Sequence, residues 1–313
     1  MLMKKTYISA LLASLALITL SCSEDESTAS YPSLSGLTIT KPVPYYSLGE
    51  TLVFEADRSR LTVSEGTMPV VGLAWQANNS KRDTLTQNVS LSNPSYTVKL
   101  DSLGSYTVTC TAFAGSEYYS TSASVSFEVI DPATALTGIS GSTTVLDGVT
   151  YFTTVVGGKT WMASNMAKSG SGIAYKGAEV SSLPLGRYYT WEEASAVCPS
   201  GWHLPSAAEW DTLGEDAGDL MADAIFLEDK MWEYWPAVNI TNSTGFNAIP
   251  VGYADKSFDS ASFSGLGNYS AFWTADSSGE MASYRYIVAG EPKIKKGQGS
   301  KSTLAMSVRC VKD

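Results

Sequence analysis

The chain has 313 residues, of which 44% are apolar; this length and composition allow two ordinary domains and exclude extensive disorder. Its formal net charge is -10, and its largest basic group is Lys293, Lys295 and Lys296. An acidic chain without a larger Lys/Arg cluster excludes a nucleic-acid partner held through its phosphates.

Residues 1–21 have the pattern of a lipoprotein signal peptide. Lys4 and Lys5 precede an apolar run from Ile8 to Leu20, which is short for a membrane span. Thr19-Leu20-Ser21-Cys22 resembles a bacterial lipobox, in which the cysteine receives lipid and becomes the mature N-terminus. The resemblance implies lipidation of Cys22 and an outer-membrane lipid anchor, because two or more acyl chains anchor a protein stably. Ordinary signal cleavage, with Cys22 unmodified, is the alternative.

Residues 22–33 are rich in serine, threonine and acidic residues, and we interpret them as a tether. The segment Ser23-Glu24-Asp25-Glu26 is similar to the acidic tag of Bacteroidota lipoproteins that are exported to the cell surface. We therefore expect an outer-membrane lipoprotein exposed on that surface.

Residues 34–131 show the period-two alternation of half-buried strands, with no helical segment between them. Spacings of this kind predict an all-β sandwich. Asp101-Ser102-Leu103-Gly104-Ser105-Tyr106 and the core position of Trp75 resemble an immunoglobulin-like domain. We interpret Cys110 as a buried free thiol. The apolar sets are Leu52, Phe54 and Ala56; Val71, Leu73 and Trp75; Tyr96, Val98 and Leu100; Tyr106, Val108 and Cys110; and Val125, Phe127 and Val129.

Asp131-Pro132 ends this region, and we assign residues 132–139 to a linker. The second domain, residues 140–313, opens with a predicted hairpin whose turn is Asp147-Gly148. Two capping boxes, Thr190-Trp191-Glu192-Glu193 and Ser206-Ala207-Ala208-Glu209, predict short helices that begin at Trp191 and Ala207.

A series of motifs in this second domain resembles the Fibrobacter succinogenes major paralogous domain. The resemblance implies an α+β C-type lectin-like fold with two short helices and an antiparallel sheet, a scaffold that formylglycine-generating enzymes share. The motifs are Trp161-Met162-Ala163-Ser164-Asn165-Met166, Gly186-Arg187-Tyr188-Tyr189-Thr190-Trp191, Cys198-Pro199-Ser200-Gly201-Trp202-His203-Leu204-Pro205-Ser206, Gly245-Phe246-Asn247-Ala248-Ile249-Pro250, Phe272-Trp273-Thr274 and Ser307-Val308-Arg309-Cys310.

Beyond Cys22 the chain has three cysteines, Cys110, Cys198 and Cys310. The sequence alone does not decide which two of them form a disulfide. The resemblance implies a disulfide between Cys198 and Cys310, because in that fold a cysteine after the first helix is bridged to one in the last strand. Cys110 then stays reduced.

Neither catalysis nor a metal centre is predicted. His203 is the only histidine, no nucleophile elbow is present, and we interpret His203 as a packed, hydrogen-bonded residue before a helix. Zinc needs three or four ligands, and the oxygen ligands Asn239, Asn242, Asp255 and Asp259 have no calcium-site spacing. We therefore expect that the protein is not an enzyme and that it binds no cofactor.

Five aromatic residues outside the motifs lie in surroundings rich in Gly, Ser and Asn, where amphipathic rings stack on sugar or protein ligands. We predict a non-catalytic recognition or adhesion module for a glycan or a host or bacterial surface protein. A structural component of a surface fibre or glycan-uptake complex is one alternative, and a formylglycine-generating-type enzyme is another. The predicted ligand residues are Trp232, Tyr234, Trp235, Tyr253 and Tyr269.

Overall fold

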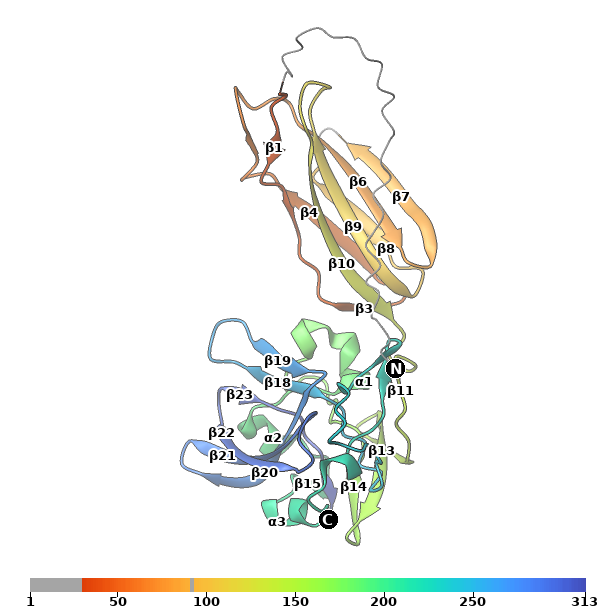
Figure 1. The fold of residues 1–313 in the computed structure, drawn as a ribbon, viewed down its shortest axis with the longest axis vertical. Coiled ribbons are helices and arrows are strands. Elements are labelled where there is room, and N and C mark those ends of the chain that lie inside the picture. Colours follow the sequence, from red (N-terminus) through yellow and green to blue (C-terminus); the bar gives the residue numbers. More distant parts are fainter. Residues whose placement is uncertain (1–29, 91–92) are drawn as a thin grey trace.

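The computed structural model describes residues 30–90 and 93–313. Cys22, the signal peptide and most of the tether lie outside these residues. Strands β1 to β10 gather in one half of the molecule and the later elements in the other (Figure 1). No helix within the described ranges is long and apolar enough to cross a membrane.

The N-terminal half consists of two main sheets and a short two-stranded one. The five-stranded sheet has the order β3-β10-β9-β6-β7, in which only the β3–β10 pair is parallel; β2-β4-β8 forms the second sheet, and β1 pairs with β5. The strands are β1 (Leu34–Ser35), β2 (Thr38–Ile39), β3 (Tyr45–Ser47), β4 (Thr51–Asp57), β5 (Thr62–Val63), β6 (Gly72–Asn79), β7 (Arg82–Ser90), β8 (Ser95–Lys99), β9 (Gly104–Phe113) and β10 (Thr121–Ile130).

Alternation in the sequence predicts the inward faces of these strands correctly. Phe54, Trp75 and Val108 are buried between the sheets, and Trp75 stacks on Tyr96 with ring centroids 5.5 Å apart. Cys110 is a buried free thiol, as predicted. The apolar sets did not anticipate β7, the edge strand that pairs with β6.

The C-terminal half holds three further sheets. Their orders are β11-β16-β17, β12-β13-β14-β24-β15, and β19-β18-β20-β21-β22 with β23 beside β18. The strands are β11 (Leu136–Thr137), β12 (Ser142–Leu146), β13 (Val149–Val156), β14 (Lys159–Met162), β15 (Trp202–His203), β16 (Ile225–Phe226), β17 (Asp229–Lys230), β18 (Val251–Asp255), β19 (Ser262–Leu266), β20 (Tyr269–Ser278), β21 (Met281–Val288), β22 (Lys295–Ser300), β23 (Leu304–Ala305) and β24 (Val311–Lys312).

The sheets of this half differ in two ways from the single antiparallel sheet expected. There are three sheets, and β18 runs parallel to β20 at one register position. The predicted hairpin is present, because β12 and β13 are joined by Asp147-Gly148 with positive φ at both residues. Strand β11 lies within residues 132–139 and pairs with β16.

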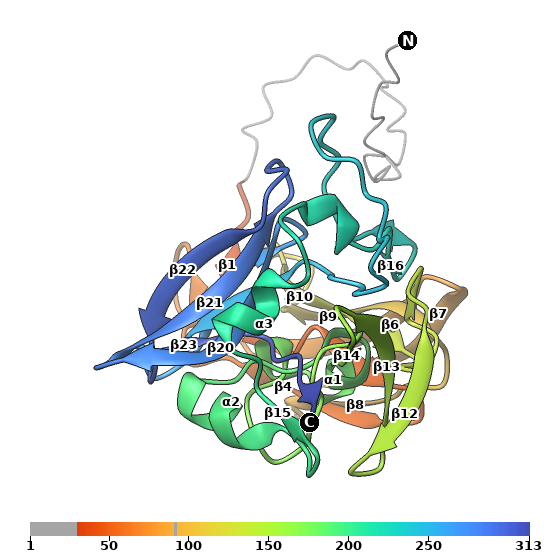
Figure 2. The ribbon, with the colours of Figure 1, turned by 90° about the horizontal axis from the view of Figure 1, so that it is seen from below.

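Few helices accompany these sheets. They are α1 (Ser182–Leu185), α2 (Trp191–Val197), α3 (Ala207–Asp211) and the 3-10 turns Tyr175–Gly177, Glu179–Ser181 and Ala217–Asp219. Both capping boxes are formed, at Thr190 with Glu193 and at Ser206 with Glu209, so the predicted starts of α2 and α3 are confirmed. Helix α1 was not predicted, because it lacks a side-chain cap. Helix α3 packs on β20 and β21 (Figure 2).

The cores follow the same division into halves. Within the described residues, one hydrophobic cluster is built from residues 34–129, and three others are built from residues 136–311. Tyr45 crosses between them: its ring lies 5.4 Å from that of Phe226 and 6.3 Å from that of Tyr175. Burial raises the pKa of Tyr45 to about 12. The protein is therefore β-rich, with two halves that meet at an aromatic contact.

Candidate functional site

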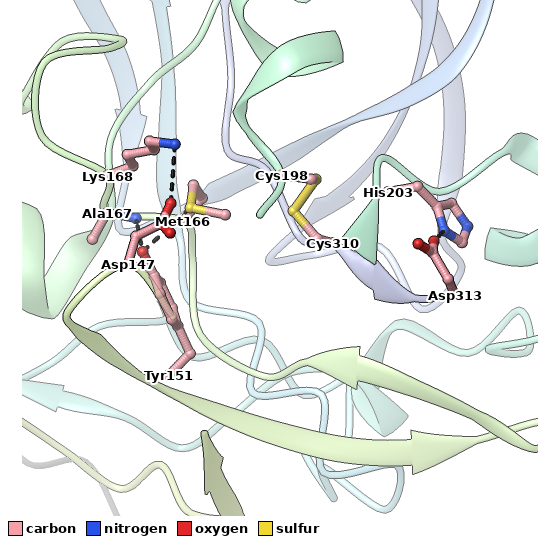
Figure 3. Close-up of a disulfide and its surroundings, with 9 residues drawn as sticks. All are labelled: Asp147, Tyr151, Met166, Ala167, Lys168, Cys198, His203, Cys310 and Asp313. Atoms are coloured by element: carbon pink, nitrogen blue, oxygen red, sulfur yellow. Dashed lines mark hydrogen bonds and ion pairs between the residues drawn. A yellow bond between two sulfur atoms is a disulfide. The ribbon is translucent and has the colours of Figure 1, made fainter. Parts of the chain in front are cut away.

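The segment from Cys198 to Trp210 has structural roles in this protein. A disulfide joins Cys198, directly after α2, to Cys310, directly before β24 (Figure 3). The pairing implied by the sequence resemblance is therefore present. Of the three cysteines in the described residues, only Cys110 is free, and burial raises the pKa of its thiol to about 11, which makes it a poor nucleophile.

His203 is hydrogen-bonded, but it is not packed as predicted. Its side chain is 38% exposed, its Nδ1 lies 2.6 Å from Asp313 Oδ1, and its Nε2 lies 3.0 Å from Glu209 Oε1. Figure 3 shows the contact with Asp313. Partial burial lowers the pKa of His203, but the two carboxylates together outweigh this effect and raise the pKa above 6.5. The imidazole thus links the last residue of the chain to the start of α3.

The carboxylate of Glu209 is held by structural interactions on both of its oxygens. Burial opposes its charge, but Lys159 Nζ at 2.7 Å, the N–H and hydroxyl of Ser206, and His203 together lower its pKa to about 2. A permanently ionised carboxylate that caps a helix is unsuited to general acid catalysis at neutral pH.

The usual metal ligands do not gather within residues 30–90 and 93–313. The part of the chain that the structure describes contains no group of three neighbouring His, Cys, Asp or Glu side chains. Asn242 exchanges hydrogen bonds with Asn247, and Asp255 accepts bonds from the N–H and hydroxyl of Ser257. Two of the oxygen ligands considered from the sequence are therefore used locally.

Arg309 explains why several sequence motifs meet in one place. Its guanidinium is buried and donates to Asn165 Oδ1 at 2.7 Å, to the carbonyl of Phe246 at 2.8 Å and to that of Asn247 at 2.9 Å. It also lies over the ring of Phe246 at 4.8 Å, a cation–π contact. Burial lowers the pKa of Arg309 to about 9. The motifs are joined by a buried polar network, which is a structural role.

The first three predicted ligand residues have different surroundings. Trp232 is only 6% exposed and its indole N–H donates to the carbonyl of Ala248, so it offers no ring face to a ligand and we remove it from the candidate set. Tyr234 is 88% exposed and Trp235 is 46% exposed, on the loop that follows β17. A cleft of about 860 Å³ between the two halves is lined by none of the five predicted residues.

Tyr253 and Tyr269 come together with two tyrosines that were not among the predicted ligand residues. The ring centroids of Tyr253 and Tyr269 are 5.7 Å apart, those of Tyr269 and Tyr286 are 5.1 Å apart and stacked, and those of Tyr286 and Tyr284 are 5.6 Å apart. All four side chains are half-buried, on β18, β20 and β21. We call these four residues the tyrosine cluster.

Glycines in β22 make room for the ring of Tyr284. Tyr284 is paired with Gly297, and a Cβ at Gly297 would lie 2.4 Å from Cζ of the Tyr284 ring. A Cβ at Gly299 would lie 2.8 Å from Leu304 and 3.3 Å from Trp273. The ring of Tyr284 therefore lies directly on the β22 backbone. It also packs nearly perpendicular to the ring of Trp273, with 5.9 Å between the ring centroids.

The hydroxyl group of Tyr269 stays protonated. Burial, the neighbouring Tyr284 with its hydrogen bond, and then Tyr286 and Tyr253 all raise the pKa of Tyr269 far above the ordinary value of 10.0. Each neutral phenol both donates and accepts a hydrogen bond. Half-buried rings that carry hydroxyl groups suit a ligand that combines apolar faces with many hydroxyl groups.

Sequence reasoning missed Tyr284 and Tyr286 as members of this site. The signal was present: the two tyrosines alternate with Arg285, so they lie on one face of a strand, and Gly297 and Gly299 alternate in the next strand. Glycines at alternate positions of a strand indicate a large side chain lying across it, which places a tyrosine flat on the sheet.

A comparison with protein-family models finds one match. The model described as the Fibrobacter succinogenes major domain matches residues 155–312, which include Arg309, the disulfide and the whole tyrosine cluster. No curated protein matches the chain.

Proposed function

The chain belongs to the Fibrobacter succinogenes major domain family, and we propose that it is a non-catalytic recognition module that binds a glycan through the tyrosine cluster. The observation that carries this proposal is the cluster itself: four half-buried tyrosines whose rings contact one another, with Tyr284 fixed between the backbone of Gly297 and the ring of Trp273. Preorganised aromatic side chains reduce the entropy lost on binding.

The proposed architecture is a C-type lectin-like domain, residues 140–313, carried by an immunoglobulin-like domain, residues 34–131. The tyrosine corner expected of the latter has a counterpart, because Tyr106 accepts a hydrogen bond from the N–H of Ser102, four residues upstream, at 3.2 Å. The buried Trp75 also supports it. Short helices beside antiparallel strands, and a disulfide from the end of α2 to the last strand, support the lectin-like assignment.

The proposed location is the cell surface, with the chain anchored in the outer membrane through lipid on Cys22. The pattern of residues 1–26 supports this proposal. The immunoglobulin-like domain then acts as a spacer that holds the tyrosine cluster away from the membrane. Lipid labelling that is as strong in a Cys22→Ala variant as in the wild type would contradict the anchor.

Two observations favour binding over catalysis of the formylglycine-generating type. That chemistry depends on reactive cysteines, and here Cys198 and Cys310 are joined in the disulfide. The remaining thiol in the described residues, Cys110, is buried in the other half of the molecule. A reactive thiol instead needs exposure and a lowered pKa.

A glycan array with residues 23–313 tests the proposed function, followed by titration calorimetry with the glycans that bind. Tyr286→Ala should weaken the affinity at least about tenfold, because central aromatic residues dominate binding energy. The matched control is Tyr119→Ala, which removes an exposed tyrosine from the N-terminal half. Circular dichroism should show both variants folded. Absence of any glycan ligand, together with capture of a defined surface protein that Tyr286→Ala still binds, would contradict the proposal.

A further inference from the structure

Four apolar side chains are exposed in the N-terminal half, close to the point where the chain enters it. Tyr31 is 46% exposed and Tyr119 is 56% exposed, and their rings meet edge to face with centroids 6.1 Å apart. Met68 is 45% exposed and Val70 is 89% exposed. We call these four residues the apolar tip.

Backbone hydrogen bonds place the two tyrosines at one end of the sandwich. The N–H of Leu34 donates to the carbonyl of Tyr119, and the N–H of Tyr119 donates to the carbonyl of Pro32, each at 2.9 Å. The entering chain is thus fixed to the connection between β9 and β10. Strand β10 runs from this connection toward the linker, so the tip lies at the end away from the C-terminal half, where Figure 1 shows β1.

Met68 and Val70 lie at the same end, because the chain is fixed there on both sides of them. The N–H of Ser64 donates to the carbonyl of Ser33 at 3.0 Å, next to the tyrosines. Gly72, the first residue of β6, is paired with the last residue of β9. The segment between these two points therefore lies beside the β9–β10 connection that carries the second tyrosine.

The predicted lipid anchor is close to this tip along the chain. Cys22 is nine residues before Tyr31. A fully extended chain spans at most about 3.6 Å per residue, so lipid on Cys22 keeps the backbone of Tyr31 within about 32 Å of the membrane surface. The other end of the sandwich is farther from the anchor by the length of β9, which at ten residues is about 33 Å.

The chemistry of the tip suits a lipid surface. Tyrosine is enriched where a membrane meets water, because its ring is apolar and its hydroxyl stays hydrated. Two arginines and three acidic residues around the tip leave a formal charge of -1, so anionic headgroups repel it little, although the whole chain carries -10. These residues, at the end of β4 and in the connections beside the tip, are Asp57, Arg58, Arg60, Glu65 and Glu117.

We infer that the apolar tip rests on the lipid surface of the membrane that anchors the chain, with Tyr31 and Tyr119 at the level of the headgroups. This inference rests on the lipid anchor proposed above and adds to it the surface that the folded protein presents to the lipid. Four side chains bind a membrane weakly by themselves, but the short tether makes their contact intramolecular. The C-terminal half, at the other end of the sandwich, is then held away from the membrane.

A fluorescent label at position 70 tests this contact. The mature lipidated protein carrying Val70→Cys is labelled with an environment-sensitive maleimide dye and placed on phosphatidylcholine vesicles whose acyl chains are brominated or unbrominated. Bromine quenches a dye that enters the membrane. Wild type is the labelling control and should stay unlabelled, because Cys110 is buried with a raised thiol pKa and Cys198 is bonded to Cys310.

Brominated lipid should lower the emission of the label at position 70 by about half or more. The matched control is Leu48→Cys, because Leu48 is 52% exposed and directly follows β3, which pairs with the other end of β10; its label should change by less than about a tenth. Tyr31→Ser/Tyr119→Ser should reduce the quenching at position 70 at least about twofold. Tyr31→Trp/Tyr119→Trp should retain it, which separates loss of the rings from a change in fold.

The results that would overturn the inference are distinguishable. Equal quenching at positions 48 and 70, or none at position 70 while the protein stays on the vesicles, refutes the contact and leaves the anchor intact. A blue shift of the label at position 70 that needs no vesicles and grows with protein concentration assigns the tip to a second copy of the chain. Failure to sediment with vesicles, with Cys22 unmodified by mass spectrometry, refutes the anchor and the inference together.

Discussion

Removal of the Cys198–Cys310 disulfide should destabilise the C-terminal half strongly. The two cysteines are 112 residues apart in sequence. In the chain-entropy model, a closed loop of this length restricts the unfolded state by about 5 kcal/mol at 25 °C. Cys310 is fully buried, so Cys198→Ala/Cys310→Ala also loses packing at that position. For a domain of this size the loss corresponds to a decrease of about 10–20 °C in Tm.

Tryptophan fluorescence during urea unfolding is the assay. The chain has eight tryptophans, and all except Trp75 follow residue 139, so the signal reports on the C-terminal half. The two halves can unfold separately, and fitting this signal alone keeps the analysis close to two-state. Wild type with a reductant should approach the double variant. Cys110→Ala, which removes the free thiol of the other core, is the control and should leave this transition in place.

The reasoning fails if the double variant loses less than about 1 kcal/mol, or if a reductant leaves the wild-type transition unchanged. Either result would mean that the loop between the two cysteines is already restricted in the unfolded state. Peptide mapping without reduction provides an independent check: a bridge between Cys110 and either partner contradicts the pairing.

Three further predictions concern single residues. The pKa of His203 in the folded protein lies above 6.5, so its ion pairs stabilise the protein below pH 6.5 and this stabilisation is lost as the pH rises through the pKa of the folded state. In urea unfolding, the stability difference between wild type and His203→Gln should therefore be present at about pH 5.5 and vanish at about pH 9. Arg309→Met should cost at least about 3 kcal/mol, measured in the same way, because it leaves buried acceptors unsatisfied, whereas an unchanged stability would show that the network is dispensable. Gly297→Val should cost about 1–3 kcal/mol and weaken glycan binding by displacing the Tyr284 ring, and equal affinity in calorimetry would argue against a preorganised cluster.

Features that depend on neighbours in sequence were predictable. A hydroxyl and a glutamate three residues apart indicated the starts of α2 and α3, because the two groups satisfy each other's backbone N–H. Alternation indicated the buried faces of the N-terminal strands, and Asp147-Gly148 indicated a hairpin turn. Motif order identified the family, which the family match confirms over residues 155–312. These signals are local, so a single sequence contains them in full.

The candidate site depended on contacts that a sequence does not specify. Trp232 and Trp235 are three residues apart in similar surroundings, yet Trp232 is buried and donates to Ala248, whereas Trp235 lies exposed on Gly290. Tyr253 meets Tyr269 only because β18 runs parallel to β20. Burial of a ring is decided by what packs on it from elsewhere in the chain, and those partners are set by the pairing of distant strands. The sequence therefore determined the elements and the family, and the tertiary structure decided which aromatic side chains come together in the candidate site.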